Sequence, residues 1–145
     1  MGKMLGGGVE SVVMNYYRHI DRSKVQFDFL VDADSTRVPE EEIKALGGRV
    51  FRIPPYQHPL RYRKELVRLF HEEHWPIVHS HINTLSVFPL SAAKKAGVPV
   101  RIAHSHSTMG KGEFAKNLMK LALRPLSNLY PTECFACSEY AGKWL

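Results

Sequence analysis

Hydrophobic positions along the chain follow two spacings that alternate. Between residues 9 and 20 they recur every three or four positions, as on one face of a helix, whereas residues 25–31 form a short β-branched and aromatic run typical of a strand. The alternation continues to the last residues, where Ser138 is expected to cap a helix that begins at Glu139. It predicts strands over residues 25–31, 49–53, 77–81, 100–106 and 133–137, and helices over residues 9–20, 39–46, 60–74, 84–96 and 113–123.

This order of elements predicts the fold class. Strands that alternate with helices and are mostly apolar indicate an α/β fold, a Rossmann-like parallel sheet with helices on both faces. No repeat or linker-like stretch interrupts residues 1–145, which are read as one domain. No strand precedes the glycines at 6–8, and the last helix has no stop signal. We therefore expect a domain that is truncated at both ends and lacks its first strand.

Composition narrows the class of protein. The 145 residues include 20 Lys and Arg against 14 Asp and Glu, which gives a net charge of +6 and favours anionic partners. Two cysteines exclude a disulfide framework, and no apolar run approaches the roughly 20 residues of a membrane span. Aromatic residues fall mostly on the predicted core faces, so nucleic acid is not an expected partner. A cytoplasmic protein is the expectation.

The glycines Gly6, Gly7 and Gly8 open the first predicted helix. Such a loop lets backbone N–H groups approach a phosphate at the positive end of the helix dipole. The spacing matches neither a Walker loop nor a dinucleotide fingerprint, and a tight turn without a ligand is the alternative interpretation.

Two His-x-His pairs, His79 with His81 and His104 with His106, fall at the ends of predicted strands. Two-residue spacing places both rings of a pair on one face of a strand, at the edge where α/β sheets bind ligands. A four-histidine metal site is one hypothesis, but no Asp or Glu nearby in the sequence supports it, and no metal or other cofactor is expected. We expect His79 and His104 to be core residues and His81 and His106 to contact ligand.

Two further patterns are each given a structural interpretation. Cys134 and Cys137 are expected to be small buried side chains, because residues three apart on a strand point to opposite faces. Lys116, Lys120 and Arg124 recur every four residues on one predicted helix. This stripe is expected to be a solvated face or to dock on an anionic membrane surface.

Four motifs occur in order along the chain: Gly7-Gly8-Val9-Glu10, Val78-His79-Ser80-His81, Ala103-His104-Ser105-His106-Ser107-Thr108 and Phe135-Ala136-Cys137-Ser138-Glu139. Taken together, they resemble the N-terminal domain of GT-B glycosyltransferases, specifically the large retaining family four. The resemblance covers essentially the whole chain, and is closest to enzymes that build capsular, exopolysaccharide or other surface glycans.

The resemblance implies transfer of a sugar from a nucleotide-sugar donor to a glycan or lipid-linked acceptor, with retained configuration and no resident metal. It implies that this chain is the acceptor-side half, inactive without a donor domain, and works in the cytoplasm or on the inner face of the membrane. His106 is the implied catalytic residue, because it matches a histidine that family members use to hydrogen-bond a hydroxyl group of the sugar. The implied substrate-binding residues are Gly7, Gly8, His81, Ser107, Thr108, Ser138 and Glu139.

Three alternatives remain open: one half of a sugar-nucleotide 2-epimerase, a histidine-rich metal-dependent hydrolase, and a binding module without catalysis. The first would use acidic cleft residues that the sequence does not show, and the second would retain zinc through His81 and His106. The leading hypothesis requires that His81 and His106 face each other and, with the glycine bend, line a sugar-binding crevice.

Overall fold

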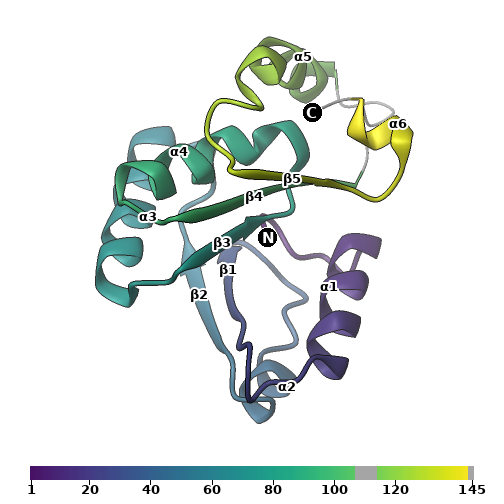
Figure 1. Cartoon of the computed structure of the whole chain (residues 1–145), viewed down its shortest axis with the longest axis vertical. Coiled ribbons are helices and arrows are strands. Elements are labelled where there is room, and N and C mark those ends of the chain that lie inside the picture. The colour runs from purple at the N-terminus through teal and green to yellow at the C-terminus, as the bar shows by residue number, and fades with distance from the viewer. Residues whose placement is uncertain (107–113, 144–145) are drawn as a thin grey trace. The chain divides into compact units, whose positions relative to one another are not determined.

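The computed structural model describes residues 1–106 and 114–143, and it confirms an α/β chain of parallel sheets flanked by helices (Figure 1). The chain divides into two compact units, residues 1–58 and residues 59–145. Within the described residues, the strands form a two-stranded ladder in the first unit and a three-stranded ladder in the second. No helix of the described part is long and apolar enough to cross a membrane.

The first unit is built from two helices and two strands. Strands β1 and β2 run parallel, in a register that pairs Asp28 with Arg49 and Asp32 with Ile53. The first strand begins at Asp28, three residues later than predicted. Before it, the Gln26 side chain accepts a hydrogen bond from the Phe27 N–H at 2.8 Å, in place of a strand partner. The elements are α1 (Gly8–His19), β1 (Asp28–Asp32), α2 (Glu40–Ala45) and β2 (Arg49–Ile53).

A short extended segment that the sequence pattern did not predict precedes α1. Gly2 forms a parallel bridge with Val31 of β1, and the Asp32 N–H donates to the Gly2 carbonyl at 3.1 Å. One edge of β1 therefore carries β2, and the other edge carries the segment around Gly2.

The core of the first unit surrounds Tyr17, whose ring is fully buried. Its hydroxyl donates to Gln26 Oε1 at 2.7 Å, and its ring stacks on Phe27 with centroids 5.3 Å apart. Gly48 is required beside it, since a Cβ there would lie 2.5 Å from the Tyr17 hydroxyl and 2.6 Å from the Phe27 carbonyl. Gly48, which follows the second helix, thus permits this close packing.

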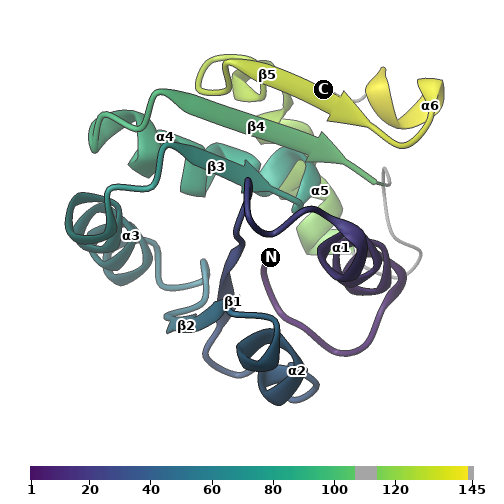
Figure 2. The ribbon, with the colours of Figure 1, turned by 60° about the horizontal axis from the view of Figure 1, so that its bottom comes forward.

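The second unit alternates helices with three parallel strands in the order β3–β4–β5, which lie side by side in Figure 2. Helix α3 packs on α4, and α4 packs on β3 and β4. All three strands of this unit end one residue earlier than predicted, and a 3₁₀ turn precedes α4. The elements are α3 (Pro59–Glu73), β3 (Ile77–Ser80), η1 (Asn83–Ser86), α4 (Val87–Lys95), β4 (Val100–Ser105), α5 (Phe114–Leu123), η2 (Arg124–Leu126), β5 (Glu133–Ala136) and α6 (Glu139–Gly142).

The two faces of this second sheet differ in composition. Ser80, Ala103 and Ser105 are buried on the face that meets α4, where only small side chains fit. His79 and His104 alternate with these residues and therefore lie on the opposite face. The strand period thus places the imidazoles together on one side of the sheet.

Candidate functional site

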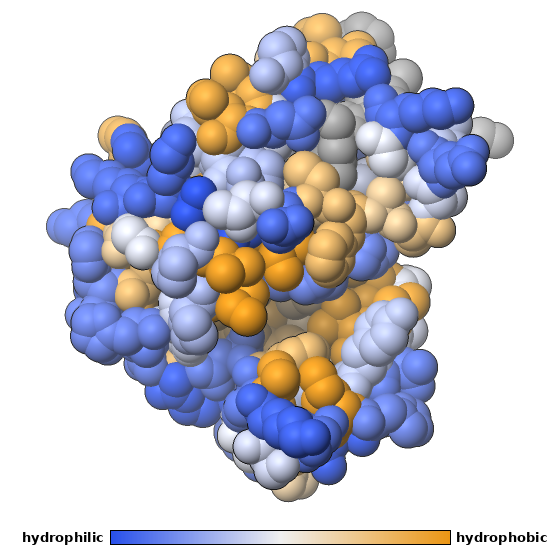
Figure 3. Space-filling model, in the orientation of Figure 1, coloured by the Kyte–Doolittle hydropathy of each residue, from blue (hydrophilic) through white to orange (hydrophobic). Residues whose placement is uncertain are grey.

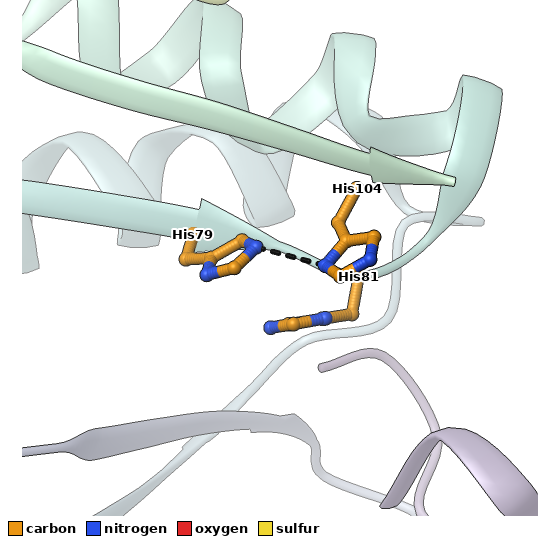
Figure 4. A group of neighbouring side chains, drawn as sticks. All are labelled: His79, His81 and His104. Atoms are coloured by element: carbon orange, nitrogen blue, oxygen red, sulfur yellow. Dashed lines mark hydrogen bonds between the residues drawn. The ribbon is translucent and has the colours of Figure 1, made fainter. Parts of the chain in front are cut away.

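Four imidazoles form a cluster at the carboxyl ends of two neighbouring parallel strands. His79 and His104 lie near the ends of β3 and β4, and His81 and His106 follow those strands directly. Figure 4 shows three of these rings gathered beneath the strand ends. The prediction that each His-x-His pair shares one face is therefore confirmed.

The cluster is held together by contacts across the strands and along them. Across the strands, Nε2 of His79 lies 3.1 Å from Nδ1 of His104, and Nδ1 of His81 lies 3.0 Å from Nε2 of His106. Along the strands, the rings of His79 and His81 stack with centroids 4.1 Å apart, as do those of His104 and His106. Each cross-strand contact needs one N–H and one lone pair, so at most one ring of a pair carries a charge.

The environment of the cluster favours neutral imidazoles. Burial, followed by the neighbouring histidines, lowers the pKa of His79 to about 4 and that of His81 to about 2. Burial also lowers the pKa of His104, and burial together with His104 lowers the pKa of His106. All four rings are therefore neutral near pH 7, and each can donate or accept a hydrogen bond to a hydroxyl group.

The expectation that His79 is a core residue is wrong. Its side chain is exposed, and His104 is only partly buried. The physical reason is the face that they occupy: Ile77, two residues before His79, is 52% exposed, whereas the buried face carries Ser80. His79 and His104 form a hydrogen bond with each other at the surface instead of being buried in the core.

The main chain of His106 is fixed by two residues that sequence reasoning missed. Its N–H donates to Oδ1 of Asn83 at 2.7 Å, and its carbonyl accepts from the thiol of Cys137 at 3.1 Å. Asn83 has a positive φ of 54°, a conformation that asparagine adopts more readily than most residues. An asparagine two residues after a His-x-His strand end was the available signal.

The expectation that both cysteines are buried is also wrong, because Cys134 and Cys137 are exposed and free. Strand β5 is an edge strand whose residues are all exposed, so a small side chain there has nothing to pack beneath. Cys134 Sγ donates to Asn128 Oδ1 at 3.5 Å, while Cys137 Sγ donates to the His106 carbonyl. The two thiols therefore serve different partners.

The glycine loop lies in the first unit and opens helix α1. Gly6 has a φ of +86°, Gly7 occupies the N-cap position and Gly8 is the first helical residue. A Cβ on Gly7 would lie 2.7 Å from Glu10 Oε2, and the Glu10 carboxylate accepts from the Leu5 N–H at 3.1 Å. A side chain at Gly7 would therefore press on the Glu10 carboxylate where that group meets the loop backbone.

A cation beside this loop was missed by sequence reasoning. A Cβ placed on Gly6 would lie 3.2 Å from Cδ and 3.6 Å from Nη1 of Arg37. The Arg37 N–H donates to the Met4 carbonyl at 3.3 Å, which brings the loop after β1 against the glycine loop. Within the described residues, the Arg37 guanidinium has no ion pair. Nothing in the sequence around residue 37 indicates this placement, because it depends on packing within the unit.

The remaining predicted binding residues take other places. Ser138 caps α6, as expected, by accepting from the Ala141 N–H at 3.1 Å, and its hydroxyl oxygen is therefore engaged within the helix. Glu139 is exposed in the first turn of α6. Ser107 and Thr108 lie outside the described residues.

The proposed membrane-facing stripe does not form one exposed face. Lys120 is buried, with 5% of its surface exposed, because α5 packs against η1. Arg124 lies in η2 and donates to the Lys143 carbonyl at 2.8 Å, and the side chain of Lys116 is not among those described. Instead Leu118 and Leu121 are 60% and 45% exposed, and Figure 3 shows hydrophobic surface over α5. The four-residue spacing was misleading because buried contacts, not charge, orient this helix.

Comparison with known proteins places the chain in a family. Residues 7–143 match the model of a family described as glycosyl transferase 4-like domain. The chain belongs to the glycosyl transferase 4-like family. It is 42% identical, over 145 aligned positions, to the "Putative glycosyltransferase EpsF" of Bacillus subtilis (strain 168). The alignment covers 96% of this chain but 38% of that relative, and no solved structure matches the chain significantly.

Both features described above fall within the part matched to the glycosyl transferase 4-like family. The match begins at Gly7, includes Arg37 and the four histidines, and extends beyond the N-cap of α6. The glycine loop and the strand ends that suggested the resemblance are therefore confirmed as parts of a glycosyl transferase 4-like domain.

Proposed function

We propose that this chain is the N-terminal, acceptor-side domain of a retaining GT-B glycosyltransferase. The enzyme moves a sugar from a nucleotide diphosphate donor to an acceptor hydroxyl, in the synthesis of a surface polysaccharide or glycolipid. Family membership and the name of the relative support the glycosyltransferase class. The finer assignments rest on the chemistry of the two features described above.

The glycine loop is suited to the departing diphosphate. Helix α1 directs N–H groups of its first turn toward its N-terminus, where Gly7 presents no side chain and the Glu10 carboxylate is engaged by the Leu5 N–H. Arg37 adds a positive charge beside Gly6. These groups would stabilise the negative charge that develops on the leaving group, which is the main requirement of transfer without a covalent enzyme intermediate. We propose that no metal ion or other cofactor takes part in this step.

In the second unit, the proposed function depends on His106. Its ring is neutral, paired with His81 and attached to a main chain held at both its N–H and its carbonyl. A neutral ring fixed in this way can hydrogen-bond a sugar hydroxyl without introducing a positive charge. It acts by orienting the sugar, and positioning of this kind is a large part of enzymatic rate enhancement. We assign His81 the role of orienting His106.

The experiment is a transfer assay on the full-length protein that contains this chain. A panel of nucleotide-sugars is incubated with cell-surface glycan and lipid-linked acceptors, with chelator present, and products are identified by mass spectrometry and NMR. We expect release of a nucleoside diphosphate and a glycosylated acceptor with the anomeric configuration of the donor. The 145-residue chain alone, as the control, should transfer no sugar. An epimerised sugar-nucleotide as sole product, or a strict requirement for added metal, would contradict the proposal.

A further inference from the structure

The histidine cluster also has the features of a metal-binding site. One nitrogen atom from each of His79, His81 and His104 lies within 4.8 Å of the others, at the surface of the second unit. Figure 4 shows these three rings drawn together from two adjacent strands. We propose that these three histidines bind a divalent transition-metal ion that prefers imidazole, with Zn²⁺ as the representative ion. The ion has no assigned role in sugar transfer, although its ligand His81 is also the residue that the proposed function assigns to orient His106.

The spacing of the nitrogens is close to what a small ion requires. Zinc–nitrogen bonds of about 2.0–2.1 Å in a tetrahedral arrangement place two ligand nitrogens about 3.3 Å apart. Nε2 of His79 and Nδ1 of His104 are already 3.1 Å apart. An ion would take the place of the proton between these two nitrogens, and that proton would move to the other nitrogen of its own ring, so that both rings stay neutral. The two nitrogens need to separate by a few tenths of an ångström, and the rings need to turn so that both lone pairs face the ion.

The third ligand is held in place by a residue outside the set. Nδ1 of His81 is engaged with Nε2 of His106, which leaves the other nitrogen of His81 available to an ion. Histidine ligands of metals characteristically use one ring nitrogen for the metal and the other for such an orienting partner. His106 is thus a positioning residue for this site. The fourth tetrahedral position is left for water.

Access and protonation also favour an ion. The His79 side chain is exposed, so an ion can reach the cluster from solvent. The rings are neutral near pH 7, so binding does not first require loss of a positive charge from them. Phe135 lies edge-on to His79 and His104, with centroids 5.6 and 5.9 Å away, and provides an apolar wall beside the site. Imidazole ligands alone select zinc, copper and nickel over magnesium and calcium.

The test is direct ion binding to the purified chain, with no activity assay. Zn²⁺ is titrated in competition with a chromophoric chelator, and Cu²⁺ is used as a probe whose electron paramagnetic resonance spectrum reports nitrogen ligands. We expect one ion per chain, an affinity reduced at least about tenfold in His79→Gln and in His104→Gln, and nitrogen coupling that weakens in both variants. His71→Gln, which changes an exposed histidine on α3, should bind as the wild type does.

Thermal unfolding with and without Zn²⁺ separates lost ligation from lost folding. A folded variant without a zinc-dependent rise in Tm supports the site, since an ion that binds only the native state stabilises it. Binding that is equal in wild type, His79→Gln and His104→Gln, or no binding by the folded wild type, would overturn the proposal. Neither result bears on sugar transfer, which is measured with chelator present.

Discussion

At the scale of single residues, charge and protonation decide what the proposed site can bind. Two-residue spacing and strand ends are local features, so the sequence correctly placed both histidines of each pair on one face at the end of a strand. Arg37 could not be predicted in the same way. It approaches Gly6 only because the segment after β1 folds back on residues 2–5, and this is a tertiary contact.

Replacing Arg37 with glutamine should weaken donor binding. The change keeps hydrogen-bonding capacity but removes the charge beside Gly6, and a charge-assisted hydrogen bond contributes about 1.5–3 kcal/mol, equivalent to a tenfold or larger change in affinity. We expect KM for the nucleotide-sugar to rise about tenfold in the full-length protein, measured by steady-state kinetics. Arg63→Gln, at an exposed position on α3, is the matched control. An unchanged KM in Arg37→Gln would remove Arg37 from the donor site.

The histidine cluster should make folding sensitive to mildly acidic pH. His79 and His81 have folded-state pKa values of about 4 and about 2, below the value of about 6.5 expected in the unfolded chain. As the pH falls below that value, the unfolded chain gains protons that the folded chain does not. The contribution of these two groups to the free energy of unfolding should therefore be constant above about pH 7.5 and fall between pH 7 and pH 5.

The measurement is chemical denaturation of the chain across this pH range. The variant His79→Gln with His81→Gln should show a shallower slope than the wild type, and His71→Gln should retain the wild-type slope. Equal slopes in the double variant and the wild type would show that the cluster is not neutral in the folded state.

At the scale of elements, most helices and strands follow from the sequence because hydrophobic period, capping and glycine stops are local. Strand β2 was predicted at its observed bounds, and the cap at Ser138 was predicted with its residue. The places that differ are governed by side chains that form hydrogen bonds with the backbone. Gln26 binds the Phe27 N–H just before β1, and Asn83 begins the 3₁₀ turn before α4.

Asn83 is expected to fix the position of His106, although the two residues are far apart in the sequence. Asn83→Ala removes the acceptor of the His106 N–H and places alanine at a φ of 54°, so we expect a loss of about 1–3 kcal/mol in stability. Asn83→Asp keeps an acceptor oxygen and a residue that tolerates this conformation.

Stability is measured by denaturant unfolding of the chain, and kcat by sugar transfer in the full-length protein. Asn83→Asp should restore most of both quantities, whereas Asn83→Gly should restore backbone conformation without restoring kcat. A kcat for Asn83→Gly equal to that of the wild type would show that the hydrogen bond to His106 has no role in positioning.

At the scale of the whole molecule, the α/β class with parallel strands was predictable because apolar strands that alternate with helices favour that arrangement. The pairing of residues 1–4 with β1 was not predictable, because it forms through a bridge at Gly2, a residue whose sequence context carries no strand pattern. Burial of Lys120 was likewise set by packing of α5 on η1, against the apparent charge stripe.

The most direct measurement is the effect of His106→Ala on kcat for sugar transfer by the full-length protein, beside the matched variant His71→Ala. If His106 contacts the transferred sugar, kcat should fall about 10²-fold or more in His106→Ala, as when one positioned hydrogen-bond group is lost, while Tm and the His71→Ala rates stay near those of the wild type. A folded His106→Ala enzyme with wild-type kcat would show that the imidazoles at these strand ends do not handle sugar.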